Sequence, residues 1–348
     1  MVDRQDAPAL RTLSSAYFAL PMATGIVSIG SHLLGHQAIA LALFAFNVVA
    51  YALLWIAYLA RALIYPRDFF GDMVSHAKGP GYLTMVAASS LLGSQFWIFT
   101  GWHWVSVALW ALAIVLWVAL LYTFFVGAVV REPKPTLEAG INGGWMVITV
   151  ATQSIAILGS FVIAELPRPD IVLFVCLAFF LLGGMFYILL IALILYRWLF
   201  FRMDAAELTP PYWINMGAVA ITTLAGSRLL LYAEAHPLAS QLAPFLAAFV
   251  LLFWATATWW IPALVAVGLW KHLVERVPIT YNAGYWSMVF PLGMYTTATF
   301  TYAQALRIDF LDFIPQGFIW IAWLAWVLTC WGMLRRLVAL ARGQASVA

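Results

Sequence analysis

The chain has 348 residues, of which 65% are hydrophobic and only 9% are charged, and its formal net charge is +3. Mean hydropathy is +0.95, whereas a soluble domain carries roughly 25% charged residues. This composition excludes a soluble globular protein and predicts an all-α polytopic membrane protein with a single transmembrane domain over residues 1–348. A membrane β-barrel is also excluded, because barrel strands alternate apolar and polar positions over about ten residues and these apolar runs do not alternate.

Ten apolar runs are long enough to cross a hydrocarbon core about 30 Å thick as helices. In chain order they lie at residues 15–35, 38–61, 82–100, 103–126, 143–164, 171–196, 211–233, 243–270, 283–305 and 315–334. We expect each run to form one transmembrane helix.

Positive charge is unequally divided between the two sides of these runs. The N-terminus, with Arg4, and the loops that follow even-numbered runs hold 14 Lys and Arg residues, whereas the opposite loops hold Arg168 and Arg307. Cytoplasmic loops are enriched in Lys and Arg. The sequence therefore predicts a multi-pass protein of the cell (inner) membrane with both termini cytoplasmic. The first run is too long for a signal peptide, so we expect it to be retained.

The odd-numbered runs resemble one another. Each begins with an aromatic residue, and the intervals between these residues are 65, 63, 67 and 73 residues. A near-constant step that covers two crossings predicts five tandem helical hairpins with the same orientation, arranged around an axis. Chance alignment of aromatic-led apolar helices is the alternative. The five repeats start near Tyr17, Tyr82, Trp145, Tyr212 and Tyr285.

Ser and Thr are concentrated in the odd-numbered runs, which also hold helix breakers, whereas the even-numbered runs are rich in Leu and Trp. We expect the odd-numbered helices to surround a polar path, because irregular membrane backbone is tolerated where it faces protein or a wet cavity. The alternative is that small residues and hydroxyls only allow tight helix packing. The candidate pore-lining residues are Met22, Thr24, Gly25, Ala87, Ser90, Val150, Thr152, Gly217, Thr222 and Pro291.

The central parts of all ten runs lack Asp, Glu, Lys, Arg and His. Intramembrane ionisable residues usually mark proton relays and ion-coupling sites, and hydrolases need a nucleophile beside a base. The sequence therefore argues against a carboxylate-driven pump and against an enzyme. The histidines lie at the ends of the runs without a metal-ligating spacing. We expect no metal site, no cofactor and no nucleic-acid partner.

Arg228 is the charged residue that reaches furthest into a run. It lies about seventeen residues from the cytoplasmic start of its helix, or roughly 25 Å at 1.5 Å per residue. That distance predicts a position near the outer mouth. Two interpretations are open: a snorkelling arginine at a helix end, or a positive charge that attracts anions to the path.

Four segments carry a resemblance to a known family: AYFALPMATGIVSIG at 16–30, KGPGYLTMVAASSLLGSQ at 78–95, EAGINGGWMVITVATQSIAILG at 138–159 and PPYWINMGAVAITTLAGSRL at 210–229. They resemble the tellurite-resistance/dicarboxylate transporter family, which includes the bacterial tellurite-resistance protein, the yeast malate permease and the plant guard-cell slow anion channel. The resemblance extends over essentially all ten of the predicted transmembrane helices. It implies five hairpins around a central pore, a homotrimer with one pore per subunit, and passage of small anions.

The resemblance also implies an aromatic gate in the ninth run, and Phe290 in WSMVFPLG looks like the matching position. The leading hypothesis is a gated pore for inorganic anions or C4-dicarboxylates in a lipid bilayer. A proton-coupled dicarboxylate (malate-type) carrier is the first alternative, with His32 or His36 as its titrating group, and a sulfite or tellurite exporter is another. A scaffold or receptor without transport would have an inner ring sealed by large apolar side chains.

Overall fold

The computed structural model describes residues 9–232 and 236–342, and every regular element within these ranges is helical. Both chain termini, with Arg4, lie outside the described residues. Helix covers most of each of the ten predicted runs. The α-helices are α1 (Ala19–Leu33), α2 (Gln37–Ile64), α3 (Pro66–Met73), α4 (Thr84–Phe99), α5 (His103–Val130), α6 (Leu137–Gly140), α7 (Val147–Val162), α8 (Pro169–Phe200), α9 (Ile214–Leu230), α10 (Pro237–Leu269), α11 (Trp286–Leu306) and α12 (Phe313–Ala341).

Seven helical stretches within the described residues are long and apolar enough to cross a membrane. They are Gln37–Ile64, Gly79–Phe99, His103–Val130, Gly143–Glu165, Pro169–Phe200, Pro237–Val274 and Asp309–Leu340. Helix α1 is a shorter apolar helix. The prediction of an all-α membrane protein is confirmed, whereas length and apolar composition by themselves support fewer crossings than the ten expected.

Five helices form a closed inner ring. Helix α1 packs against α4, α4 against α7, α7 against α9, α9 against α11, and α11 returns to α1. In the stretch Gly143–Glu165, which contains α7, 94% of the most apolar 18-residue segment is buried. The corresponding value for Gln37–Ile64, which is α2, is 22%. The ring helices are therefore enclosed by protein, and they are the helices of the odd-numbered runs.

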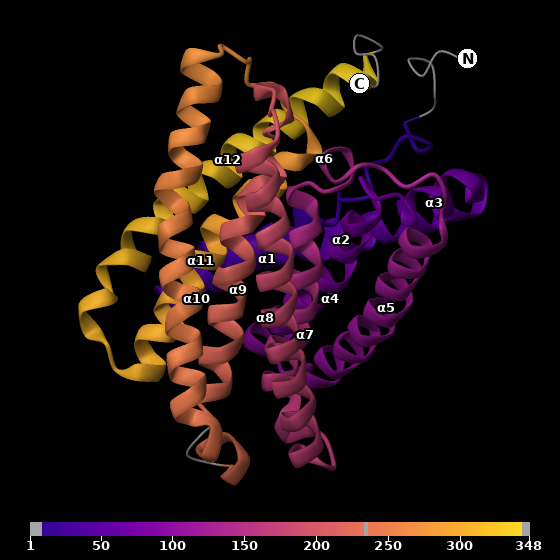
Figure 1. Cartoon of the computed structure of the whole chain (residues 1–348). Coiled ribbons are helices and arrows are strands. Elements are labelled where there is room, and N and C mark those ends of the chain that lie inside the picture. The colour runs from indigo at the N-terminus through magenta and orange to yellow at the C-terminus, as the bar shows by residue number, and fades with distance from the viewer. Residues whose placement is uncertain (1–8, 233–235, 343–348) are drawn as a thin grey trace.

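The even-numbered runs form an outer layer of longer helices around this ring. Each of α2, α5, α8, α10 and α12 packs against the ring helix that precedes it in the chain. Each also contacts the next ring helix, and α12 in this way reaches α1. Figure 1 shows α8 and α10 running along most of the height of the molecule. Apolar side chains such as Leu53 and Trp331, about 60% exposed, cover the free face of this layer and suit contact with lipid.

Hydrogen bonds from outer-layer aromatics tie four of the outer helices, α2, α5, α10 and α12, to the following ring helix. Trp117 on α5 donates its indole N–H to Thr152 Oγ1 on α7 at 2.9 Å. Trp326 on α12 donates in the same way to Thr24 Oγ1 on α1 at 3.0 Å. These bonds satisfy the indole N–H groups and the hydroxyls inside the bilayer, where water is not available as a partner. Further bonds of this kind join Tyr51 to Ser89, Trp254 to Thr299 and Trp323 to Ser31.

Two arginines at the ends of outer helices make matching contacts. Arg61 on α2 donates to Tyr82 Oη at 2.9 Å, and Arg197 on α8 donates to Tyr212 Oη. Each guanidinium also pairs with a carboxylate of the segment between the two helices, Arg61 with Asp72 at 2.7 Å and Arg197 with Glu207 at 3.1 Å. Burying an arginine is costly unless it is paired. Both arginines therefore fasten an outer helix to the aromatic residue that opens the next ring helix.

Candidate functional site: the axis of the helix ring

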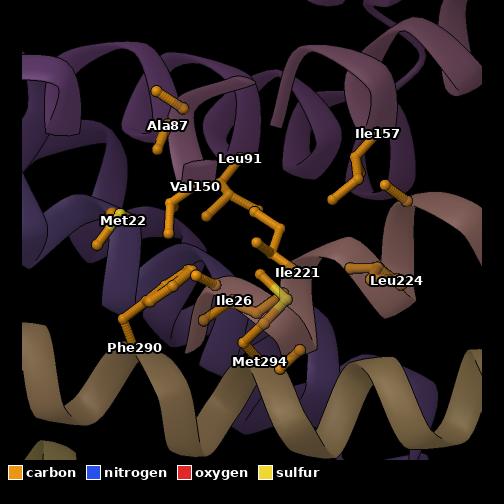
Figure 2. Packing of buried hydrophobic residues seen from close by; sticks show 14 of the residues in the cluster. Met22, Ile26, Ala87, Leu91, Val150, Ile157, Ile221, Leu224, Phe290 and Met294 are labelled. Carbon is orange, nitrogen blue, oxygen red and sulfur yellow. The ribbon is translucent and has the colours of Figure 1, made fainter. Parts of the chain in front are cut away.

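Apolar side chains from all five ring helices converge at the centre of the ring (Figure 2). Met22 and Ile26 come from α1, Val150 from α7, and Phe290 and Met294 from α11, and each of these five is 0% exposed. The centre of the ring is therefore filled by close-packed apolar side chains, which exclude water.

The converging residues stand at fixed offsets from the aromatic that opens each predicted repeat. Offsets of five and nine residues differ by about one helical turn, so these positions lie on one face of each helix. We call the two sets layer 1 and layer 2. Layer 1 is Met22, Ala87, Val150, Gly217 and Phe290, and layer 2 is Ile26, Leu91, Ser154, Ile221 and Met294.

The same face continues into a cavity of about 120 Å³. Two further sets, twelve and sixteen residues after the opening aromatics, all line this cavity, so every ring helix contributes to its wall. We call it the outer cavity. The two sets are Ile29, Ser94, Ile157, Leu224 and Thr297, followed by Leu33, Ile98, Phe161, Arg228 and Thr301.

A larger, open cavity of about 610 Å³ lies where four of the ring helices begin. Its wall comes from the segments that lead into α4, α7, α9 and α11, including Ala77, Asn142, Thr209 and Asn282. We call it the inner vestibule. Asn142 and Asn282 each cap a helical turn by accepting a backbone N–H, from Gly144 in the first case. The axis thus runs from the inner vestibule, through the apolar layers, to the outer cavity.

Phe290 is held against a glycine of the neighbouring ring helix. A β-carbon at Gly217 would lie 3.2 Å from Phe290 Cε1 and 2.8 Å from Pro291 Cγ. Pro291 lies inside α11, where it cannot donate a hydrogen bond to the carbonyl of Ser287 and so weakens the helix locally. None of the aromatic ring pairs among the described residues includes Phe290. Its ring therefore lies beside Gly217 and outside every described pair of aromatic rings.

The candidate hydroxyls lie at other offsets and bond elsewhere. Thr24 and Thr152 accept the outer-helix indoles described above. Ser90 Oγ accepts from Ser154 Oγ at 3.2 Å, between α4 and α7. Thr222 donates to the Ala218 carbonyl of its own helix at 2.7 Å. These hydroxyls join helices or satisfy their own backbone.

Gly25 also belongs to a contact between helices. A β-carbon at Gly25 would lie 3.1 Å from Asn47 Nδ2 on α2 and 3.3 Å from Leu91 Cβ on α4. Asn47 itself donates to Gln95 Oε1 at 2.6 Å. The small residue at position 25 therefore makes room for a buried pair of amide side chains that links α2 to α4.

Arg228 lies in the wall of the outer cavity, near the end of α9. Its guanidinium carbon is 3.9 Å from the centroid of the Phe161 ring, and its Nε donates to Ser160 Oγ at 3.2 Å. No described carboxylate forms an ion pair with Arg228. Stacking on an aromatic face and one hydrogen bond therefore hold the charge beside the cavity.

The residues predicted from the sequence to line the path include no member of layer 2 and neither partner of Arg228. Ile26, Leu91, Ile221 and Met294 each lie four residues after a layer 1 position, and this helical spacing was the available signal. Phe161 could have been found from its offset, which is the same as that of Arg228. The contact between the two side chains needs the structure.

Comparison with known proteins identifies relatives along nearly the whole chain. Residues 12–334 match a family described as voltage-dependent anion channel. A protein of Methanocaldococcus jannaschii named as a transporter is 23% identical over 327 residues, covering 92% of this chain and 93% of the relative. The sulfite efflux pump SSU1 of Trichophyton rubrum is 24% identical over 362 residues, covering 93% and 91%. A Mycobacterium tuberculosis membrane protein is 40% identical over 153 residues, covering 44% and 77%.

Proposed function

This chain belongs to the SLAC1 (voltage-dependent anion channel) family, whose members are transporters and channels rather than enzymes, and we propose that it passes small anions along the axis of its five-helix ring. The observation that carries the proposal is the shared register of the ring helices. Four offsets from the opening aromatics give two layers that are apolar except for Ser154, and the wall of the outer cavity. One face of each helix is thus turned to a common axis with an opening at either end.

Ten crossings in five tandem hairpins are part of this proposal. Helices α9 and α11 are buried between other ring helices, so they can cross with fewer apolar residues than a lipid-facing helix needs. Thr24, Ser89 and Thr152 stand seven residues after the opening aromatics of the first three repeats. Each bonds an aromatic of an outer helix from another repeat. A shared contact at a shared offset supports a true repeat over chance alignment.

We propose that the path is gated at layer 1 and that Phe290 is the gate. It is the one ring in a layer whose other members are Met22, Ala87, Val150 and Gly217. A bulky apolar side chain in a narrow path closes it by excluding water. Pro291 allows α11 to bend next to the ring. The structure then represents a closed state.

The apolar layers also match what a scaffold without transport would show. Two observations favour transport. The apolar seal lies between the inner vestibule and the outer cavity, each lined by several repeats. The outer cavity carries Arg228 without a described carboxylate partner, and a scaffold has no need of such a charge.

The charge distribution in the sequence and the family resemblance support proposals for the orientation, the assembly and the membrane. We propose that both termini are cytoplasmic in the cell (inner) membrane, because Lys and Arg are concentrated on that side. The outer cavity and Arg228 then open to the outside. We also propose a homotrimer with one path per subunit. The exposed apolar faces of the outer helices are available for lipid or for neighbouring subunits.

Sulfite export is the second candidate, and the similarity to fungal sulfite efflux pumps over 93% of this chain supports it. A proton-coupled dicarboxylate carrier would need a titrating group on the path. His32 meets that condition, since it lines the outer cavity, whereas His36 packs its ring against Trp323 at 4.8 Å.

Current recording from purified protein in planar bilayers separates these functions. We expect currents whose reversal potential follows the anion gradient and is unchanged by a proton gradient. A reversal potential that shifts with the proton gradient would identify a coupled carrier instead. Protein that assembles normally but carries no anion current under any gradient would contradict the proposed function.

A further inference from the structure

The outer cavity offers an anion one fixed positive charge. Arg228 is the arginine in its wall, and the remaining described wall is built mainly from Ile, Leu and Phe side chains. A guanidinium has five N–H donors, and the described hydrogen bonds of Arg228 use one of them, to Ser160. Donors are therefore available for a ligand in the cavity. Phe161 and Ser160 fix the position of the charge before any ligand arrives.

The hydroxyls in the wall add few donors, because their protons are already used. Ser94 Oγ donates to the Ser90 carbonyl at 3.0 Å. Thr297 Oγ1 donates to the Gly293 carbonyl at 3.1 Å, and Thr301 Oγ1 donates to the Thr297 carbonyl at 2.9 Å. A ligand that needs many hydrogen bonds to replace its hydration shell would not find them here.

We propose that the outer cavity is a binding site for one singly charged, weakly hydrated anion, such as a halide, nitrate or hydrogensulfite, and that it discriminates against dianions such as sulfate and C4-dicarboxylates. A dianion would bring twice the charge into an apolar wall that offers one counter-charge, and the desolvation penalty of an ion rises steeply with its charge. A single anion beside Arg228 leaves the pair neutral. The cavity, at about 120 Å³, has room for a small anion and a few waters, since one water needs at least about 10–15 Å³.

His32 is the other titratable side chain in the wall. Its Nδ1 lies 3.0 Å from Gln37 Oε1 and its ring packs edge-on against Phe99. A second positive charge at this place would relax the discrimination against dianions. The binding test is therefore made at about pH 8, above the ordinary pKa of a histidine side chain.

This inference deepens the proposed function and rests on it, but its direct test is binding rather than transport. Crystals of the purified protein soaked in bromide at about pH 8 should show an anomalous peak within hydrogen-bond distance of Arg228. Nitrate should displace the bromide, and equal concentrations of sulfate or malate should not. Arg228→Gln should abolish the peak or weaken bromide binding about tenfold or more, tenfold corresponding to 1.4 kcal/mol.

Arg168→Gln is the matched control. Arg168 is predicted to lie on the same side of the membrane but is exposed and paired with Asp170, so its loss should leave the peak unchanged. Absence of a peak in the wild type, an unchanged peak in Arg228→Gln, or displacement by sulfate as effective as by nitrate would each overturn the inference. Anion currents without a bromide site would refute the site and keep the proposed function. A bromide site in protein without anion currents would support the site and refute the proposed function.

Discussion

Gly217 on α9 lies against the ring of Phe290 on α11, so close that a β-carbon at position 217 would stand 3.2 Å from Phe290 Cε1. The same β-carbon would meet Pro291 Cγ at 2.8 Å, a separation that requires one of the two groups to move. The absence of a side chain at position 217 therefore sets where the Phe290 ring rests. A gate that depends on this ring should respond to changes at position 217.

Gly217→Ala should lower the anion current per molecule, because the added methyl group pushes the Phe290 ring towards the axis. In a Phe290→Ala background the methyl group still meets Pro291 but has no ring to push, so we expect a smaller fractional loss of current. The measurement is a double-mutant cycle on single-molecule conductance and open probability. An equal fractional loss in both backgrounds would show that position 217 acts independently of Phe290.

Layer 2 should limit how far the removal of Phe290 opens the path. Ile26, Leu91, Ile221 and Met294 remain packed one helical turn away in Phe290→Ala. We expect Met294→Ser in that background to raise the current further, because a second hydroxyl in the layer, besides that of Ser154, favours wetting. Met294→Ser alone should raise the current less than Phe290→Ala. Identical currents in Phe290→Ala and the double variant would remove layer 2 from the conduction barrier.

Single cysteines should distinguish the cavity face from the interhelix face of the ring. Once Cys176 and Cys330 are replaced by Ala, an externally added water-soluble thiol reagent should label Thr301→Cys in the outer cavity. It should not label Thr152→Cys, whose native hydroxyl accepts the Trp117 indole, nor Leu53→Cys on the free face of the outer layer. Labelling of position 152 but not of position 301 would reverse the assignment of the two faces.

The bond between Trp117 and Thr152 should contribute to stability and not to conduction. Thr152→Val leaves the Trp117 N–H without its acceptor, and we expect a loss of about 1 kcal/mol, since bonds between membrane helices average about 0.6 and a buried unsatisfied donor costs about 1–3. Unfolding in a denaturant titration measures this loss. Thr222→Val is the control, because that hydroxyl bonds only its own helix and should cost less. A change in current per assembled molecule in Thr152→Val would contradict the assignment.

The sequence was sufficient for the helices and for the division into a buried and an exposed set. The odd-numbered runs combine small residues, Ser, Thr and an opening aromatic, and the structure buries the corresponding helices. The alternation of polar-rich and apolar runs is informative here, because the lipid-facing helices must be apolar along most of their surface. The overall composition therefore predicts a membrane protein. The polar content of each helix predicts whether that helix is buried or exposed.

The face that each ring helix turns to the axis could not be predicted from polarity. In a soluble protein a hydroxyl usually faces water, but inside a membrane Thr24 and Thr152 are needed as acceptors for outer-helix indoles. The axis instead carries apolar residues at a four-residue spacing, which looks like ordinary core packing in sequence. Arg228 was visible as a charge near a mouth, whereas its stacking on Phe161 depends on how α7 and α9 pack together.

We propose that anions move along the ring axis and that Phe290 closes it. The most direct test is single-molecule current from wild-type and Phe290→Ala protein in planar bilayers under a chloride gradient. We predict larger and more constitutive currents in Phe290→Ala, an intermediate level in Phe290→Leu, and reversal at the chloride potential.

Phe124→Ala is the packing control, since Phe124 is 1% exposed and packs edge-on against Trp145 at 5.1 Å. It should cost about 3–5 kcal/mol of stability without raising the current per molecule. Wild-type conductance and open probability in well-assembled Phe290→Ala would contradict the account.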